Sequence, residues 1–405
     1  MKKYELKPGL FYVGIKNPTL RTFDIVMRTD YGTTYNSYLI KDEKNALIET
    51  AHHSFFDSYI ESVQEIVDLN TIDYIILNHT EPDHSGSLNN LVKLCPHATV
   101  VCTTPASIYL KAITNNSAIK FQIAKNGDTI SLGRNSLQFI LAPFLHWPDT
   151  MFTYCSEMST VFTCDFLGAH YCEDAIVDSK IHYVNKYKHG FLNYYNDIFS
   201  PFKKHVLEGL KKLSGLPFDM ACVSHGPVLT SSGLLNYAMD SYYALSNTVM
   251  PQTPKITPVF YCSAYGFTRK IADAIVKEIN KISSDYNCQS YDIIEHDMNM
   301  LIKLMNESVG FLIGSPTINR DTVPPVLSLL SHIDAINSAK KPVGVFGSYG
   351  WSGEAIPTIV ARLSSIKLNP INSGLKINFN PSISDDDQIK AYAKDFTDAI
   401  ASYAK

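Results

Sequence analysis

The sequence has no Cys-x-x-Cys pair, no long apolar run and no marked excess of charge of either sign. Its eight cysteines are scattered through strand-like runs, which indicates buried free thiols in a reducing compartment. The missing Cys-x-x-Cys pairs argue against a built-in rubredoxin or iron–sulfur module. With 35 basic and 39 acidic residues, nothing favours binding to nucleic acid or to an anionic membrane surface.

The distribution of apolar residues along the sequence indicates neither a targeting segment nor a membrane-spanning segment. The N-terminus lacks the apolar core of a signal peptide, and no run reaches the roughly 18 apolar residues that a membrane span needs. We therefore expect a cytoplasmic protein that acts on small molecules.

The 405 residues, of which 45% are hydrophobic, are sufficient for two ordinary domains. In residues 1–250, short strands alternate with turns and a few helices, and the economical packing for this order is an αββα sandwich. The Pro- and Thr-containing stretch 248–255 has the composition of a linker. From 256 to 405 strands and helices alternate, which predicts a doubly wound sheet of five parallel strands.

The expected strands are short in the first domain and regularly spaced in the second. Early in the first domain, one antiparallel sheet is expected from the runs at 10–14, 25–27, 35–40 and 46–49. A helix is expected at 54–67, and a helical stretch at 186–213 is expected to be interrupted at Pro201. In the second domain we expect strands at 256–261, 289–294, 309–313, 342–346 and 375–379.

The segment 79–84, His-Thr-Glu-Pro-Asp-His, carries the strongest chemical signal of the chain. It joins a strand-like apolar run to a predicted helix start, so that His79, Glu81 and Asp83 would project to one side of an extended segment, with His84 at the turn. Two imidazoles and two carboxylates suit iron, manganese or zinc. The alternative is a polar loop that caps the helix, but four such residues in six positions exceed what capping needs.

Three further ligand candidates each follow a predicted strand: His146, Asp165 and His225. Loops at strand ends are frequent places for functional sites. An aspartate there can bridge two metal ions, and one histidine on each side would complete two coordination sets with open positions. A lone histidine at a strand end is more often a hydrogen-bonded structural residue, so the prediction of a two-metal site rests on the combination.

Three loops of the second domain follow strands at the carboxyl edge of the sheet, where such sheets bind ligands. The first offers hydroxyls and backbone amides at a helix N-terminus, a neutral phosphate cradle. The third carries Tyr349 and Trp351, which could place a ring face against a flat ligand. A phosphorylated aromatic cofactor, FMN, fits both features, and ordinary turns of a regulatory domain are the alternative. The expected FMN residues are Ser263, Ala264, Tyr265, Gly266, Phe267 and Thr268, then Ser315, Pro316, Thr317, Ile318 and Asn319, and finally Ser348, Tyr349, Gly350, Trp351, Ser352 and Gly353.

On these motifs the whole chain resembles flavodiiron proteins of the simplest architecture, a metallo-β-lactamase-like domain followed by a flavodoxin-like domain. The His-x-Glu-x-Asp-His loop is the specific part, because hydrolases of the same superfold carry His where this chain has Glu81. The first FMN loop resembles the family's Ser-x-Tyr-Gly-Asn-Thr form, with Phe267 where Asn is common. The resemblance implies that His79, Glu81 and His146 hold one iron, that Asp83, His84 and His225 hold the other, and that Asp165 bridges them.

The resemblance also implies an activity. It is the reduction of dioxygen to water, or alternatively of nitric oxide to nitrous oxide, with FMN and two iron ions as cofactors. A head-to-tail homodimer or a dimer of dimers is implied, with the flavin of one chain beside the irons of another. Electrons are expected from a separate donor: a rubredoxin-like protein, a reductase or a reduced soluble cofactor. Tyr194, Tyr195 and His170 resemble positions near the diatomic ligand, although a role in the aromatic core is at least as consistent.

Two other classes of protein stay open from the sequence. One is a zinc hydrolase in which the metal activates water and the flavodoxin-like part only binds or regulates. The other is an electron-transfer flavoprotein with a degenerate first domain. Glu81 argues against the hydrolase, and the complete set of candidate ligands argues against the electron-transfer protein.

Overall fold

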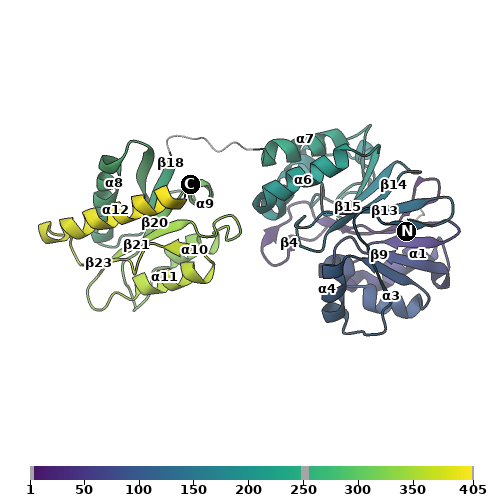
Figure 1. Ribbon diagram of the computed structural model, residues 1–405, viewed down its shortest axis with the longest axis horizontal. Coiled ribbons are helices and arrows are strands. Elements are labelled where there is room, and N and C mark those ends of the chain that lie inside the picture. Colours follow the sequence, from purple (N-terminus) through teal and green to yellow (C-terminus); the bar gives the residue numbers. More distant parts are fainter. Residues whose placement is uncertain (1–3, 248–254, 404–405) are drawn as a thin grey trace. The chain divides into compact units, whose positions relative to one another are not determined.

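The structure, a computed structural model, describes residues 4–247 and 255–403 (Figure 1). The chain divides into two compact units, Met1–Thr248 and Val249–Lys405. The linker expected at 248–255 lies outside the described residues except for Lys255, which begins a strand. Within the described ranges, no helix is long and apolar enough to cross a membrane.

The first unit is built on two main sheets, with strand orders β1-β2-β7-β8-β9-β10-β11 and β12-β13-β14-β15-β16-β17. The first sheet contains β1 Tyr4–Lys7, β2 Leu10–Tyr12, β7 Tyr38–Ile40, β8 Asn45–Ile48, β9 Ile72–Ile76, β10 Thr99–Cys102 and β11 Phe121–Ile123. The second contains β12 Thr129–Ser131, β13 Ser136–Leu141, β14 Met151–Cys155, β15 Thr160–Cys164, β16 Met220–Val223 and β17 Leu229–Thr230.

The two sheets pack face to face, with helices on their outer faces (Figure 1). Along β8, Ala46 and Ile48 pack into the core between the sheets, whereas Leu47 packs into the core beneath the outer helices, as the period of a strand requires. The αββα sandwich predicted from the sequence is confirmed. Its helices are α1 Phe56–Gln64, α2 Pro82–Ser85, α3 Leu88–Leu94, α4 Thr104–Thr114, α5 Val184–Tyr194, α6 Lys203–Ser214 and α7 Leu235–Ser246.

Two expectations for the first sheet are wrong. The run at 35–40 is split between β6 Thr33–Tyr35, which pairs with β3 Ile15–Asn17 outside the main sheet, and β7. The run at 25–27 is mostly a turn between the two-residue strands β4 Thr22–Phe23 and β5 Met27–Arg28. Ile25 has a positive φ of 70° and is 94% exposed. Its β-branched side chain suggested a strand, but strand preference expresses packing on a sheet face, and this turn has none.

The second unit has one parallel sheet in the order β19-β18-β20-β21-β22, with β23 also paired to β21. Its strands are β18 Lys255–Tyr261, β19 Tyr286–Asp292, β20 Phe311–Gly314, β21 Pro342–Tyr349, β22 Asn369–Pro370 and β23 Leu375–Asn378. Because β22 pairs with the start of β21 and β23 with its end, the sheet is five strands wide, and the doubly wound prediction is confirmed. Cores on both faces pack under α8 Phe267–Ile282, α9 Met298–Glu307, α10 Pro324–Ser331, α11 Ala355–Ser365 and α12 Asp386–Tyr403.

Asp42, which follows β7, joins the two sheets of the first unit at one edge. Its carboxylate accepts hydrogen bonds from the backbone N–H and side-chain amide of Asn135 at 2.8 and 2.6 Å and from the backbone N–H and Nε of Arg134, both at 3.2 Å. Burial acts to raise the pKa of Asp42, but these bonds and one from the Glu43 backbone outweigh it and lower the pKa to about 2. The charged form is therefore the one that the fold holds.

We expect Asp42→Asn to lower the free energy of unfolding by about 1 kcal/mol, since an amide replaces the charged acceptor of these hydrogen bonds. Because the folded pKa lies below the ordinary 3.8, this contribution is complete above about pH 4 and is lost as the pH falls toward 2. Thermal melts from pH 8 to pH 3 would measure it. Asp387→Asn, at a 96% exposed side chain, is the control, and equal melting of Asp42→Asn and wild type at pH 7 would contradict the prediction.

Candidate metal centre and flavin site

The loop that follows β9 changes direction at Pro82. Helix α2 begins there, since proline suits the first helical position, and Glu81 is the residue that precedes it. His79 and Glu81 therefore lie on the extended part of the loop, whereas Asp83 and His84 project from the first turn of α2. The expectation that Asp83 shares an extended segment with His79 and Glu81 is wrong, and the turn separates the loop into two ligand pairs.

The first pair lies beside His146. The Oε2 atom of Glu81 is 3.0 Å from Nε2 of His146 and 3.4 Å from Nε2 of His79. The same two nitrogens are 3.5 and 3.7 Å from Oδ2 of Asp165. These four side chains can hold one metal ion between them.

The second pair lies beside His225. The Oδ2 atom of Asp83 is 3.1 Å from Nε2 of His225 and 3.3 Å from Nε2 of His84. The Oδ1 atom of Asp165 is 3.1 Å from Nε2 of His84 and 3.3 Å from Nε2 of His225. Asp165 thus turns one oxygen to each set, and the structure brings all seven predicted residues together.

The chemistry of this cluster fits two cations. Among the described residues, both oxygens of Asp83, both oxygens of Asp165 and Nε2 of His84 are buried without a hydrogen-bond partner. Buried charges without such partners are costly unless they coordinate metal or are paired closely. Nitrogen and carboxylate donors without thiolate suit iron. The residues present therefore fit a diiron centre.

Without metal, the same cluster must hold protons. Burial by itself would lower the pKa of His84 and of His225, but Asp165 and Asp83 raise these pKa values to about 9 and about 10. Burial would raise the pKa of Asp165, yet the facing imidazoles hold it well below its usual range. At neutral pH the metal-free cluster is therefore an array of carboxylates and imidazolium ions.

We expect metal loading of the apoprotein to release protons and to tighten as the pH rises. The imidazoles of His84 and His225 must lose a proton before they can bind a cation, so the affinity for Co²⁺ should increase between pH 6 and pH 9. Calorimetric titration in buffers of different ionisation enthalpy would count the protons. An affinity independent of pH over this range would contradict the assignment of the pKa shifts.

Two of the imidazoles are oriented from behind by oxygen atoms. Nδ1 of His79 is 3.1 Å from Oδ1 of Asp149, and Oδ2 of the same carboxylate accepts a hydrogen bond from the Thr80 hydroxyl at 2.7 Å. Nδ1 of His225 donates to the Thr34 carbonyl oxygen at 2.6 Å. Such partners fix the tautomer and the ring direction. No motif in the sequence pointed to Asp149, although its place three residues after His146 is a usable signal.

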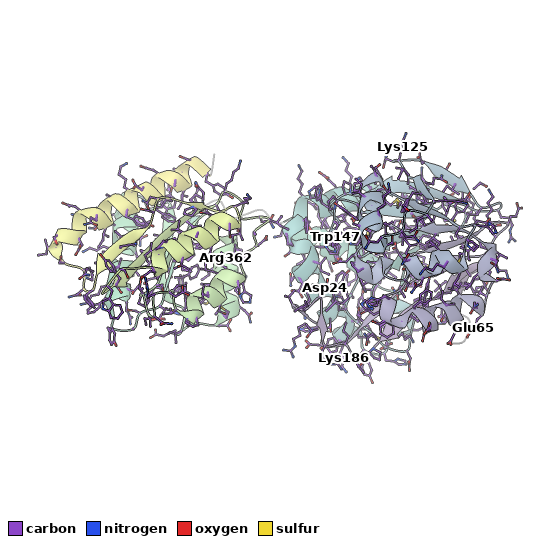
Figure 2. The ribbon with its side chains drawn as sticks, turned by 90° about the horizontal axis from the view of Figure 1, so that it is seen from below. Asp24, Glu65, Lys125, Trp147, Lys186 and Arg362 are labelled. Carbon is purple, nitrogen blue, oxygen red and sulfur yellow. The ribbon has the colours of Figure 1, made fainter. Side chains whose placement is uncertain are left out.

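Asp24 and Trp147, which are labelled in Figure 2, each neighbour a ligand of this cluster. The indole of Trp147 packs edge-on against the ring of His79, with centroids 5.0 Å apart. Burial and the adjacent Glu81 carboxylate raise the pKa of Asp24 to about 6. The turn that replaced the expected strand therefore brings a further carboxyl group to the centre, which no motif in the sequence indicated.

The structure gives different surroundings to Tyr194, Tyr195 and His170, the three residues expected near the diatomic ligand. Tyr195 donates to or accepts from the Ser246 hydroxyl at 2.7 Å, so its polar end is used in the core. Tyr194 is buried and packs 5.9 Å from the ring of His225. The ring of His170 is 5.4 Å from the same imidazole, and burial holds the pKa of His170 well below its usual value. Tyr194 and neutral His170 thus border the second ligand set.

The predicted flavin loops meet at the carboxyl edge of the second sheet. The first loop joins β18 to α8, and Gly266, with a φ of +81° directly before the helix, provides no side-chain cap; the N–H of Arg269 is 3.3 Å from the Ser263 hydroxyl. The hydroxyls of Thr268 and Ser348 are 2.9 Å apart and connect the first and third loops. The rings of Tyr265 and Trp351 are 86% and 92% exposed. Open amides for a phosphate and free aromatic faces for a flat ring fit FMN.

Comparison with known proteins agrees with this arrangement. A family model described as "ODP family beta lactamase" matches residues 33–226, and one described as "Flavodoxin" matches 259–392. The flavo-diiron protein FprA2 of Clostridium acetobutylicum is 45% identical over 401 residues, covering 99% of this chain and 100% of that protein. This chain belongs to the flavodiiron protein family. The resemblance inferred from the motifs is confirmed, and the family's cofactors, FMN and two iron ions, are those of this protein.

Other relatives of this flavodiiron protein carry names that state different activities. The anaerobic nitric oxide reductase flavorubredoxin of Pectobacterium carotovorum is 34% identical, over 88% of this chain and 71% of that protein. The crystal structure of the flavodiiron protein from Giardia intestinalis superposes with a TM-score of 0.68 at 27% identity, covering 100% of this chain and 98% of that one. Rubredoxin oxygen:oxidoreductase from Desulfovibrio gigas, at 23% identity and a TM-score of 0.69, shares the fold over the full length of both chains.

Proposed function

We propose that this flavodiiron oxidoreductase reduces dioxygen to water at its first-unit metal centre. One iron is held by His79, Glu81 and His146, the other by Asp83, His84 and His225, and Asp165 bridges them. The observation that carries the proposal is the carboxylate of Asp165, which turns one oxygen to each set of imidazoles at 3.1 to 3.7 Å. When bound, two ferrous ions and a reduced flavin supply the four electrons that the reaction needs.

The side chains around the centre serve this reaction by excluding water and by holding protons. Phe23, Tyr194 and His170 pack against His225 and close that side of the site. Asp24 places a further carboxyl group beside Glu81. Reduction of dioxygen to two waters consumes four protons, twice the demand of joining two nitric oxide molecules into nitrous oxide and water. A carboxyl group at this place could pass protons to the centre, and dioxygen reduction makes the larger use of it.

Nitric oxide reduction is the second candidate function. It is favoured by the relatives named anaerobic nitric oxide reductase, which are 31 to 34% identical to this chain. The two candidates separate in one experiment, in which the anaerobically reduced protein is exposed to each gas under the same reductant at an electrode. Fast loss of dioxygen with little nitric oxide turnover would support the oxidase, and the reverse would support the nitric oxide reductase. Turnover of neither gas by protein that contains iron and FMN would overturn both.

The remaining assignments extend this proposal to the whole chain. Residues 1–250 form the diiron domain and 256–405 the FMN domain, with FMN held by the loops at 263–268, 315–319 and 348–353. Electrons come from a separate donor, either a rubredoxin-like protein, a reductase or a reduced soluble cofactor. A cytoplasmic location fits the eight free cysteines.

The proposed assembly is a head-to-tail homodimer or a dimer of dimers. This assembly would favour electron transfer, because a flavin of one chain placed beside the irons of another would shorten the distance that electrons travel from flavin to iron. Sedimentation velocity combined with activity at decreasing concentration tests it. A monomer that keeps full activity would contradict it.

A further inference from the structure

The roles given so far to the residues of the metal centre do not explain what orients the His84 ring from its Nδ1 edge, the edge that points away from the metal ligands. His79 and His225 each have an oxygen partner behind the ring, at 3.1 and 2.6 Å. Behind His84, the neighbour of Nδ1 is the Cys164 thiol, with Sγ at 4.0 Å. A thiol at that distance is a weak acceptor and cannot by itself fix an imidazole.

Glu49 lies at this edge of the ring. Its carboxylate, the Cys164 thiol and a ring nitrogen of His84 all lie within 4.8 Å of one another. Glu49 is 1% exposed, its Oε1 accepts a hydrogen bond from the Asn78 backbone at 3.0 Å, and its Oε2 has no partner among the described residues. A buried carboxylate oxygen without a donor is expensive, so an adjacent N–H is its natural partner.

The backbone shows that this placement is imposed by the fold. Glu49 and Cys164, both close to this edge of the ring, have φ values of +60° and +53°, which cost free energy for residues with a Cβ. The same segment clamps the ligand loop. Thr50 donates both its backbone N–H, at 3.1 Å, and its hydroxyl to the carbonyl oxygen of His84. Residues 49 and 50 thus hold Asn78 at the start of the loop and His84 at its end.

We propose that Glu49 is a positioning residue for the second metal ion. With Nε2 of His84 turned to the cation, the proton of the ring stays on Nδ1 and is donated to Oε2 of Glu49. This contact directs the ring and, by drawing on its Nδ1 proton, makes the imidazole a stronger ligand of the more highly charged, oxidised metal pair. The inference rests on the proposed ligand set. A separate metal site at Glu49, His84 and Cys164 is disfavoured, because Nε2 of His84 faces Asp83 and Asp165, and binding a further cation through Nδ1 would require a fully deprotonated ring.

The test compares two substitutions that act on the same histidine. Glu49→Gln keeps the shape and an acceptor for Asn78 but turns an amide toward Nδ1. Thr50→Val removes the hydroxyl that holds the backbone of His84. The apoproteins are titrated with Co²⁺, followed by the visible spectrum, and the reduction potential of the iron-loaded proteins is measured. For Glu49→Gln we expect the second equivalent of Co²⁺ to bind 10- to 100-fold more weakly, the first equivalent unchanged, and the potential raised. Thr50→Val should lower the melting temperature without either selective effect.

Several results would overturn the inference. They are wild-type binding of both equivalents by Glu49→Gln, an equal weakening of both equivalents, or a third equivalent bound by wild type and lost in this variant. Should Glu49→Gln fail to fold, Glu49→Asp is the substitute, because it keeps the carboxylate but moves it one methylene away from His84. Wild-type affinity of Glu49→Asp for the second equivalent of Co²⁺ would also contradict the inference. Wild-type protein that binds fewer than two equivalents would instead refute the proposed ligand set, whatever the role of Glu49.

Discussion

Replacing Asp165 with Asn should lower gas-reducing turnover on the order of 100-fold or more while leaving FMN bound. The reason is that the two carboxylate oxygens of Asp165 face different sets of metal ligands. Oδ1 faces His84 and His225, and Oδ2 faces His146 and His79, with each distance between 3.1 and 3.7 Å. An amide has one oxygen and one NH₂, and the NH₂ cannot bind a cation. Whichever way the side chain turns, one metal site loses its shared ligand.

The measurement is iron and FMN content per chain, followed by dioxygen and nitric oxide electrodes on the reduced protein. Asp178→Asn is the matched control. Asp178 is equally buried in the first unit, but it accepts its hydrogen bonds from Thr230 and Leu234 instead of facing imidazoles. The control should lose stability and keep iron. Wild-type turnover by Asp165→Asn would remove the two-metal centre from the mechanism.

The seven proposed ligands could be found from the sequence because each stands at a position that local rules identify. The group at 79–84 is dense enough to exceed capping, and His146, Asp165 and His225 each follow a run that reads as a strand. The sandwich and the doubly wound sheet follow from the order of strands and helices. These features depend on residues close together in the chain, which is where sequence reasoning is strongest.

The residues that orient the ligands could not be found in this way. Asp149 and Glu49 act on His79 and His84, yet Glu49 is 35 positions away from its partner and follows an ordinary buried strand. Their roles depend on which ring edge faces which carboxylate, and strand pairing decides that. Asp24 could not be found because its local sequence pointed to the wrong structure. Its neighbours Ile25 and Val26 suggested a strand, whereas their exposure shows a turn that delivers the carboxyl group to the centre.

The phosphate loop offers a second large effect, which is independent of the metal centre. Replacing Gly266 with Val should weaken FMN binding on the order of 10- to 100-fold and leave the iron content unchanged. The φ of +81° costs a β-branched residue about 1–2 kcal/mol, and roughly 1.4 kcal/mol corresponds to a tenfold change in affinity. A Cβ at Gly266 would meet no atom within 4 Å, so the cost of the substitution comes from the backbone conformation and not from steric overlap.

The chain provides a closely matched control for this substitution. Gly127, in a turn of the first unit, has a φ of +87° and the same open space around its Cα. Gly127→Val therefore carries equal backbone strain without any cofactor nearby. Titration of the flavin-free proteins with FMN, followed by quenching of flavin fluorescence, gives both affinities. If Gly266→Val bound FMN as tightly as Gly127→Val, the strain at the helix N-terminus would be irrelevant to binding, and the phosphate would have to be held elsewhere than at the loop 263–268.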